Sequence, residues 1–584
     1  MAHEVDVDAR RAATAARFPA WPGWTLAQAF DQAADQHPDR PLFTNEQGTR
    51  SYRAMQEWSR RLALGLMASG VQPGDHVALL MANYAEFVAV KLAIARIGAV
   101  TIPVNFNLRG EELRYVLDQS DAVALIVMDQ FRGHDYLADL DRFVPTWRSA
   151  GGGGGGALAM LRDVFVFSTE GVQPLGAGTL HDLIALGEGG DSAALAARTA
   201  AVDPHATCDV LYTSGTTGRS KGVILTHDMI LRVAYSSVYH RALSDGRSTA
   251  HALPMYHVYG YVECLVVAWF VGGAVVTQLV FEPVAFMERL EKHRATDIIA
   301  LPNQTIKLLE VAAGGGIDSS SLVQVFNSGG VNPPDIWDDI RTILKPREVI
   351  TAYGMSETTA SSTCTLPDGN DRHLVSNGCY KLAHVAGDPS FGGHVAIYKV
   401  IDPETGAEMP HGEIGELVAK GPIVTAGYYR KPEETAATFT ADGWLRSGDL
   451  GTMSAEGYLT LTGRLKESYR CGGEMIMPRE IEALVETLPQ VALALAVGVP
   501  DRRMGEVGCL CIVSTAGHRT DPAPLIALCN AQLARFKVPR HVLFFEAMDI
   551  PMTSTGRPQK VRLAQIAREM LERESLSTAV VARG

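Results

Sequence analysis

A run of small and charged residues, LYTSGTTGRSKGV, spans positions 211–223 and is well suited to binding an anion. Its glycines allow backbone N–H groups to converge on one point, its hydroxyls add donors, and Lys221 supplies a positive charge. Strand-like residues flank the run on both sides. It is not the common P-loop, because Arg219 rather than Lys follows Gly218. We therefore predict a phosphate-binding loop of another type.

Six further segments combine glycine, hydroxyl and charged residues, and they follow the loop along the chain. They are LPMYH (253–257), NSGG (327–330), TAYGMSET (351–358), GWLRSGDLG (443–451), GRLKESYRCGGEMIMPREIE (463–482) and PMTSTGRPQK (551–560). The whole series resembles the adenylate-forming superfamily of acyl-CoA synthetases, adenylation domains and luciferases. The resemblance includes residues 103–126 and 425–439, and so covers nearly the whole chain.

The resemblance implies a site for the phosphates of ATP and for Mg²⁺. Glu357 would hold the metal together with Thr213, and oxygen ligands of this kind suit Mg²⁺. Ser356 stands where the superfamily usually has Thr, near the α-phosphate. The residues implied for the phosphate loop are Thr213, Ser214, Gly215, Thr216, Thr217, Gly218 and Lys221.

The resemblance also implies a site for the nucleoside. Tyr353 would stack on adenine beside Gly354, and Asp449 would accept the ribose hydroxyls. Arg464 would add a contact to ribose or phosphate. The residues implied for lining the adenine and acyl pockets are Gly329 and Gly330.

Three positions are implied for the acyl group and for CoA. His257 would form a gate at the carboxylate end of the acyl tunnel. Lys466 would be the hinge between a large and a small domain, which would close in one orientation for adenylation and in another for thioester formation. Gly472 and Gly473 would let the pantetheine chain approach the backbone, because glycine has no side chain to obstruct it.

The sequence departs from the superfamily near its C-terminus, where Arg557 replaces the usual catalytic lysine. Arginine keeps the positive charge but differs from lysine in reach and geometry. Lys560 is the alternative carrier of this role. Ser220 replaces the proline common in the phosphate loop, and the segment between Glu357 and Gly415 lacks the usual glycine–proline pattern, which points to an unusual acid.

The elements that must position these residues alternate between strand and helix patterns. Apolar runs at 76–82 and 123–129 predict strands covered on both faces, and residues 85–99 have helical spacing that ends at a glycine. We predict an α/β fold with a large N-terminal domain (1–465) of layered α/β subdomains plus a β-barrel-like subdomain. A small, mobile α+β domain (466–584) follows. The glycine run at 149–160 predicts a flexible surface insertion.

The charge and hydrophobic patterns limit the kinds of partner that the protein is expected to bind. The 584 residues carry 52 Lys and Arg against 65 Asp and Glu, a net charge of −13 that argues against nucleic acid as the main partner. The uncharged run 264–281 is split by Gly272 and Gly273, so we expect a buried helix–turn–strand unit and no integral membrane segment. The N-terminus lacks a signal-peptide pattern, and we expect a cytoplasmic protein, with a homodimer suggested by the resemblance alone.

These inferences lead to an ATP-dependent carboxylic acid–CoA ligase that forms acyl-AMP and then acyl-CoA. One alternative is an adenylating enzyme that passes its acyl group to an amine or to a carrier-protein thiol. Another, suggested by Arg557, is a catalytically weak protein that binds nucleotide or acyl groups.

Overall fold

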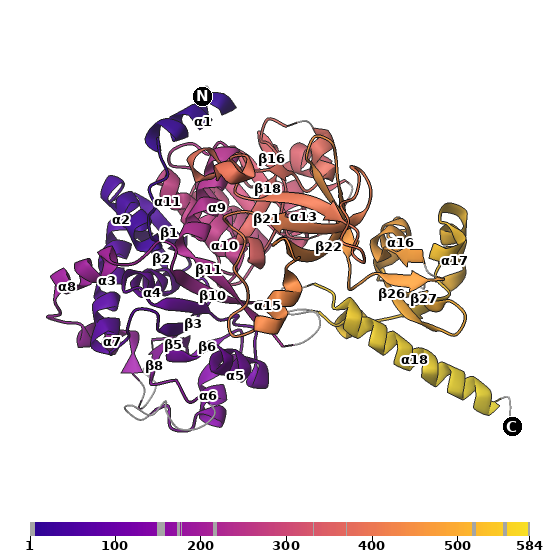
Figure 1. Cartoon of the computed structure of the whole chain (residues 1–584), viewed down its shortest axis with the longest axis horizontal. Helices are drawn as coiled ribbons and strands as arrows, with labels where there is room; N and C mark the ends of the chain where they lie inside the picture. Colours follow the sequence, from indigo (N-terminus) through magenta and orange to yellow (C-terminus); the bar gives the residue numbers. More distant parts are fainter. Residues whose placement is uncertain are drawn as a thin grey trace.

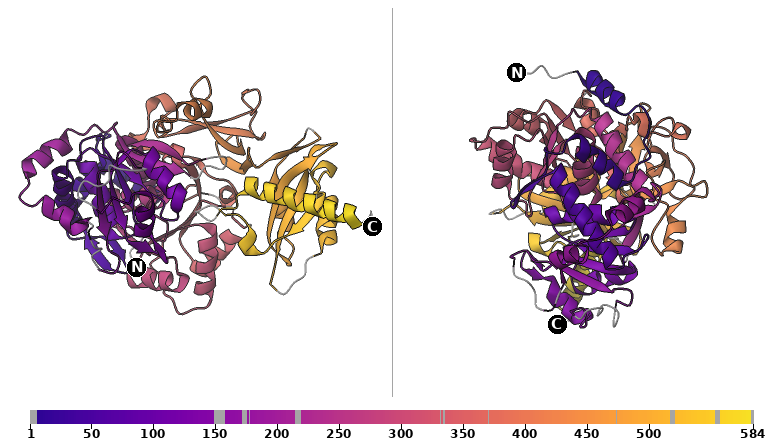
Figure 2. Two further views of the ribbon diagram at one scale, coloured as in Figure 1. Left: turned by 90° about the horizontal axis from the view of Figure 1, so that it is seen from below. Right: turned by 90° about the vertical axis from the view of Figure 1, so that its left-hand side faces the viewer.

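The computed structural model describes residues 6–148, 158–171, 176, 178–213, 219–330, 332–333, 335–369, 371–472, 474–516, 521–552 and 557–581. Most of the described chain forms one large α/β body, and the C-terminal part stands to one side of it (Figures 1 and 2). A separate hydrophobic core runs from Tyr469 to Ala567, whereas the cores of the large body end before it. The prediction of a large and a small domain is confirmed, and the boundary at 465/466 stays a prediction.

Two seven-stranded sheets form the body. The first has the order β11-β10-β4-β3-β5-β8-β9 and the second has the order β16-β15-β14-β12-β13-β1-β2. The first consists of Lys221–Thr226, Thr207–Thr213, Val100–Pro103, His76–Leu80, Ala122–Met128, Asp163–Phe167 and Gly178–Thr179. The second consists of Glu348–Ile350, Gln324–Asn327, Asp297–Ala300, Ser248–His251, Ala274–Thr277, Pro41–Asn45 and Gly48–Ser51.

Helices cover these sheets. Helix α4 (Ala85–Arg96) matches the predicted helix and is buried along its whole length, and its Lys91 pairs with Asp209 of β10. The chain leaves α4 through Gly98 at φ +68°, a left-handed conformation that favours glycine. Other long helices of the body are α1 (Val7–Arg17), α2 (Leu26–Gln36), α3 (Tyr52–Ala68), α5 (Gly110–Gln119), α9 (His227–His240), α12 (Pro283–Lys292) and α13 (Pro302–Ala313).

The apolar run at 264–281 folds as predicted. A π-helical turn, Tyr261–Val266, continues into α11 (Val267–Val271), which ends at Gly272 in the left-handed region before β13 begins. None of the helices in the part of the chain that the structure describes has both the length and the apolar character needed to cross a membrane. The predicted glycine-rich insertion lies mostly outside the described residues, which resume at position 158.

Antiparallel strands follow the two large sheets and carry much of the site. They form a three-stranded sheet, β17 (Ala352–Met355), β18 (Ala360–Cys364) and β19 (Cys379–Tyr380), and a four-stranded sheet, β20 (Ile397–Ile401), β21 (Gly415–Lys420), β22 (Leu445–Met453) and β23 (Leu459–Arg464). Both lie within the large domain, in which a β-barrel-like subdomain was expected. The strand order is that of open sheets, and no pairing between described strands closes a barrel.

The small domain has the α+β pattern expected from its sequence. Its strands are β24 (Tyr469–Cys471), β25 (Glu474–Ile476), β26 (Val491–Asp501), β27 (Gly505–Ser514) and β28 (His541–Phe544). Helices α16 (Pro478–Val485) and α17 (Pro522–Gln532) pack against each other. The last helix, α18 (Lys560–Val581), crosses the domain and extends beyond it (Figures 1 and 2).

Candidate active site

The two strands that flank the predicted phosphate loop are paired antiparallel. Thr213 ends β10, Lys221 begins β11, and these two residues are direct partners across the pair. The hairpin therefore fixes both ends of the predicted loop at the edge of the first sheet. The predicted loop residues Ser214, Gly215, Thr216, Thr217 and Gly218 lie outside the described residues.

A second group of predicted residues meets around Asp449. Asp449 of β22 and Arg464 of β23 are cross-strand partners, and Arg464 Nε lies 3.0 Å from Asp449 Oδ1. The hydroxyl of Tyr353, on β17, donates to Asp449 Oδ2 at 2.7 Å. Both carboxylate oxygens are thus oriented, and each retains a lone pair for a further donor such as a ribose hydroxyl. The structure brings together three residues that are 96 and 15 positions apart in sequence.

Glu357 is a buried acid close to the loop strand. It lies in a 3₁₀ turn, Ser356–Thr358, and its Oε1 accepts a hydrogen bond of 2.9 Å from the hydroxyl of Tyr428. Burial raises the pKa of Glu357, and the bond from Tyr428 opposes that rise. Lys221 Nζ lies 4.6 Å from the centre of the Tyr428 ring. Tyr428 therefore connects the predicted metal ligand with the predicted phosphate-binding lysine.

The small domain contributes one cation to this region. Arg557 donates through Nη2 to the backbone oxygen of Gly329 at 2.6 Å, across the two domains. The positive charge of Arg557 also acts on His257. Burial, and to a smaller extent this charge, lowers the pKa of His257 to about 4. The Nδ1 of His257 accepts from the backbone N–H of Tyr259 at 3.2 Å, so the neutral ring carries its proton on Nε2. His257 and Gly329 thus lie at the same end of the site as Arg557.

Lys560, the alternative to Arg557, has other partners. Its Nζ lies 2.7 Å from Glu482 and 3.8 Å from Glu467, both in the small domain. In this orientation of the domains Arg557, not Lys560, reaches the large body.

Close packing or a left-handed backbone explains why glycine is found at several of the predicted positions. Gly329, at φ +86°, packs so closely that a Cβ would lie 2.8 Å from Leu301 and 3.4 Å from Tyr259. Gly354 lies against the neighbouring strand β18, where a Cβ would overlap the backbone of Ala360. Gly472, at φ +63°, makes a turn against Met504. Gly330 packs on Pro302, and Gly473 is outside the described residues.

The predicted hinge residue, Lys466, lies in the exposed turn after β23, where the chain leaves the four-stranded sheet for the small domain. Backbone bonds from Glu467 and Ser468 to the carbonyl oxygen of Arg464 shape this turn. Its position between the two cores is compatible with a hinge, which stays a prediction.

The segment that departs from the superfamily pattern is anchored in the interior. Its Lys381 is fully buried and lies 3.4 Å from Glu263 in the π-helical turn that follows His257. Glu263 also accepts from the hydroxyls of Ser237 and Ser361. The buried pair therefore connects this segment to the helical turn that follows His257, the predicted acyl gate.

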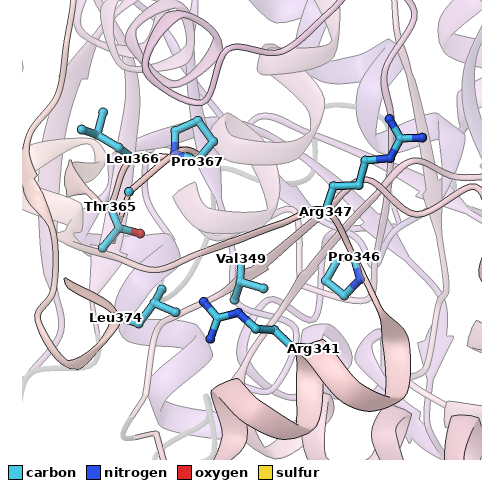
Figure 3. A pocket seen from close by; sticks show the side chains of 9 residues that line it. Arg341, Pro346, Arg347, Val349, Thr365, Leu366, Pro367 and Leu374 are labelled. Atoms are coloured by element: carbon cyan, nitrogen blue, oxygen red, sulfur yellow. The ribbon is translucent and has the colours of Figure 1, made fainter. Parts of the chain in front are cut away.

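A separate hollow of about 260 Å³ lies beside the edge strand β16. Arg341 extends into it toward Leu374 and Val349, whereas the guanidinium of Arg347 points away from them (Figure 3). None of the residues that line it is a predicted site residue, so we assign it no part in the reaction.

Comparison with known proteins identifies the family of this chain. Residues 30–429 match the AMP-binding enzyme family, and residues 480–557 match the AMP-binding enzyme C-terminal domain. The chain belongs to the AMP-binding enzyme family.

Individual relatives are similar over almost their whole length. A putative acyl-CoA synthetase, YngI, from Bacillus subtilis is 32% identical over 94% of this chain and 98% of its own. The 3-[(3aS,4S,7aS)-7a-methyl-1,5-dioxo-octahydro-1H-inden-4-yl]propanoyl:CoA ligase of Mycobacterium tuberculosis is 31% identical over 93% and 99%. Among solved structures, ATP-bound MatB from Rhodopseudomonas palustris superposes with a TM-score of 0.77 at 28% identity, over 93% of this chain and 99% of MatB.

Proposed function

We propose that this protein is an AMP-forming carboxylic acid–CoA ligase that works through an acyl-adenylate. The observation that carries the proposal is the contact of Arg557 with Gly329. A cation of the small domain lies near His257, and Tyr353, Asp449 and Glu357 lie close together in the large body, which supports the proposal. The family and the named CoA ligases among the relatives support the same reaction.

In the first half-reaction, a carboxylate oxygen attacks the α-phosphorus of ATP, and the bond to pyrophosphate breaks. Lys221 would offset the charge of the phosphates, and Arg557 would orient the carboxylate beside the α-phosphate. Asp449 would hold the ribose, so that the reacting groups meet in a fixed orientation. The neutral ring of His257 leaves the acid as the negatively charged group at the acyl gate.

A magnesium ion fits the residues at this site. Glu357 has one oxygen held by Tyr428, and Thr213 supplies a hydroxyl at the end of β10. Oxygen donors of this kind suit Mg²⁺, which usually retains waters and binds through a carboxylate and substrate phosphates. When bound, the ion would supply charge neutralisation at the phosphates.

In the second half-reaction, the CoA thiolate attacks the acyl carbon, and AMP leaves. The small domain would rotate at Lys466 between the two steps, withdrawing Arg557 and presenting the turn at Gly472, which Gly473 follows in the sequence. The homodimer suggested by the resemblance stays a proposal.

The acid is proposed to be aliphatic or aromatic. Next to Gly329 lie Tyr259 and Leu301, which pack on an apolar cluster formed by Leu253, Cys264, Ile299, Phe326, Ile350, Ala352 and Cys364. Such a wall favours burial of an apolar acyl group over a highly charged one.

Pyrophosphate release over a panel of acids tests the proposal. The panel contains straight-chain fatty acids, aromatic acids, a bulky bicyclic propanoic acid and malonate, each with and without CoA. We expect pyrophosphate with an apolar acid, and acyl-CoA only when CoA is present. Acyl transfer to an added amine but not to CoA would favour the alternative adenylating enzyme. No pyrophosphate with any acid, despite ATP binding, would favour a nucleotide-binding protein.

A further inference from the structure

Tyr428 occupies a position between the two charged groups that the proposed function assigns to phosphate and metal. Its hydroxyl donates to Glu357 Oε1 at 2.9 Å, and its ring lies under Lys221 Nζ at 4.6 Å. Sequence motifs alone assigned it no role, although it lies in a segment, 425–439, that carries the family resemblance. One side chain thus contacts two predicted functional groups from elements far apart in sequence.

The backbone around Tyr428 is fixed to the strand that begins at Lys221. Tyr428 forms an antiparallel bridge with Val223, and its neighbours Gly427 and Tyr429 exchange backbone hydrogen bonds with Ile224 and Gly222. Because strand β11 and the 427–429 segment are paired, the ring of Tyr428 keeps its place beneath Lys221.

A second set of bonds fixes the turn that carries Glu357 to the same segment. The backbone N–H of Thr425 donates to the carbonyl oxygen of Glu357 at 2.8 Å, and the hydroxyl of Thr425 donates to the carbonyl oxygen of Ile224 at 2.7 Å. The segment at 425–428 therefore joins the loop strand and the turn of Glu357 in one frame.

Burial indicates that the hydroxyl of Tyr428 serves a purpose beyond packing. Tyr428 and Glu357 are each only 9% exposed, so a phenylalanine would fill the same space without the need to satisfy a buried hydroxyl. A hydrogen bond to a carboxylate is stronger than one between neutral groups. It orients one oxygen of Glu357, and the carboxylate retains lone pairs for a ligand.

We propose that Tyr428 is a positioning residue that couples the phosphate-binding Lys221 to the metal-binding Glu357. Its hydroxyl fixes the orientation of Glu357 toward Mg²⁺, and its ring holds the ammonium group of Lys221 through a cation–π contact. This inference rests on the proposed function, because it takes Glu357 and Lys221 as the groups that meet Mg²⁺ and ATP.

The neighbouring Tyr429 provides a matched control. Its hydroxyl donates to Asp121 at 2.9 Å, away from Glu357, and Arg430 pairs with the same aspartate. Tyr428→Phe and Tyr429→Phe therefore each remove one hydroxyl from adjacent positions, but only the first removes a bond to the predicted metal ligand.

The test measures binding of ATP by calorimetry, with and without Mg²⁺, and the Mg²⁺ dependence of pyrophosphate release. We expect Tyr428→Phe to raise the Mg²⁺ concentration needed for half-maximal effect by about 10- to 100-fold, the usual range for a group that orients a metal ligand. Binding of ATP without Mg²⁺ should be unchanged, because the ring under Lys221 remains. Tyr428→Leu should weaken that binding as well, and Tyr429→Phe should match the wild type in every measurement.

A double variant distinguishes the proposed coupling from a general loss of stability. In the Glu357→Gln background, Tyr428→Phe should add no further change in Mg²⁺ dependence if the two residues act together. Equal Mg²⁺ dependence for Tyr428→Phe and Tyr429→Phe, or full additivity with Glu357→Gln, would overturn the coupling. Failure of the proposed function would give a different result, because no acid would then release pyrophosphate from the wild type. Calorimetry could still compare the Mg²⁺ dependence of ATP binding in Tyr428→Phe and Tyr429→Phe.

Discussion

Arg557 Nη2 lies 2.6 Å from the backbone oxygen of Gly329, although the two residues are 228 positions apart and belong to different domains. The contact brings the guanidinium of Arg557, the residue that stands at the position of the superfamily's usual lysine, close to Gly329 and His257, which are predicted to border the nucleotide and acyl sites. The departure in sequence therefore does not remove a cation from the site.

The first prediction concerns this arginine. Arg557→Ala should lower the turnover number of adenylation by about 100-fold or more, the scale expected when a preorganised group that stabilises developing charge is removed. The thioester step, started from pre-formed acyl-AMP, should continue. Arg557→Lys should retain activity because it restores a positive charge. Single-turnover assays of each half-reaction measure both effects.

Lys560 supplies the control for Arg557. Lys560→Ala should break the pairs with Glu482 and Glu467 and lower the melting temperature, while adenylation by the remaining folded protein is preserved. If Lys560→Ala instead abolishes adenylation and Arg557→Ala is harmless, the catalytic role belongs to Lys560.

The second prediction concerns Glu357. Glu357→Gln should raise the Mg²⁺ requirement of adenylation by about 100-fold or more, at least as much as Tyr428→Phe, because a neutral amide is a weaker ligand for a hard cation. The fold should be maintained, since the amide oxygen can still accept from Tyr428. Burial raises the pKa of Glu357, so replacing the carboxylate should leave thermal stability at pH 7 equal or higher. A Mg²⁺ titration identical to that of the wild type would remove Glu357 from the metal site.

Local sequence patterns predicted the elements but not every contact of the site. The apolar runs that became β3 and β5 and the helical spacing that became α4 are properties of neighbouring residues, so they can be recognised directly in the sequence. The grouping of Tyr353, Asp449 and Arg464 came from resemblance, because cross-strand register is not a local property.

The orientation of Tyr428 could not be predicted from local sequence patterns. Two adjacent tyrosines have the same local pattern, yet their side chains point to opposite sides, one to Glu357 and the other to Asp121. Only the pairing of Tyr428 with Val223 decides which tyrosine faces the site. The reach of Arg557 likewise depends on the orientation of the small domain, which no local pattern records.

The third prediction tests the hinge. Lys466→Pro should spare adenylation and impair thioester formation by tenfold or more, because proline fixes φ near −65° and restricts rotation at this turn. The described orientation already brings Arg557 to Gly329, so restricted rotation should not disturb the first step. Lys466→Ala is the control and should retain both steps. Equal loss of both half-reactions in the proline variant would contradict the assignment of Lys466 as the hinge.

The last prediction concerns three buried histidines that must stay neutral in the folded protein. The Nδ1 atoms of His227 and His251 accept backbone N–H groups from Leu26 and Leu253, and that of His240 accepts from Leu382. Burial is the main reason that the pKa of each ring falls to about 3. Protonation of Nδ1 would also break each of these bonds.

The sign of the resulting pH dependence follows from linkage. In the unfolded chain these rings take up protons near pH 6.5, whereas the folded protein resists protonation down to about pH 3, so stability falls as the pH drops through this window. Between pH 7 and pH 5 each histidine should reduce the free energy of unfolding by about 2 kcal/mol.

His251→Asn retains an acceptor but cannot titrate, so its melting temperature should fall less between pH 7 and pH 5 than that of the wild type. His205→Asn, at a ring 73% exposed, is the control and should keep the full dependence. A His251→Asn variant whose melting temperature falls as steeply as that of the wild type would show that His251 is not among the groups responsible for acid sensitivity.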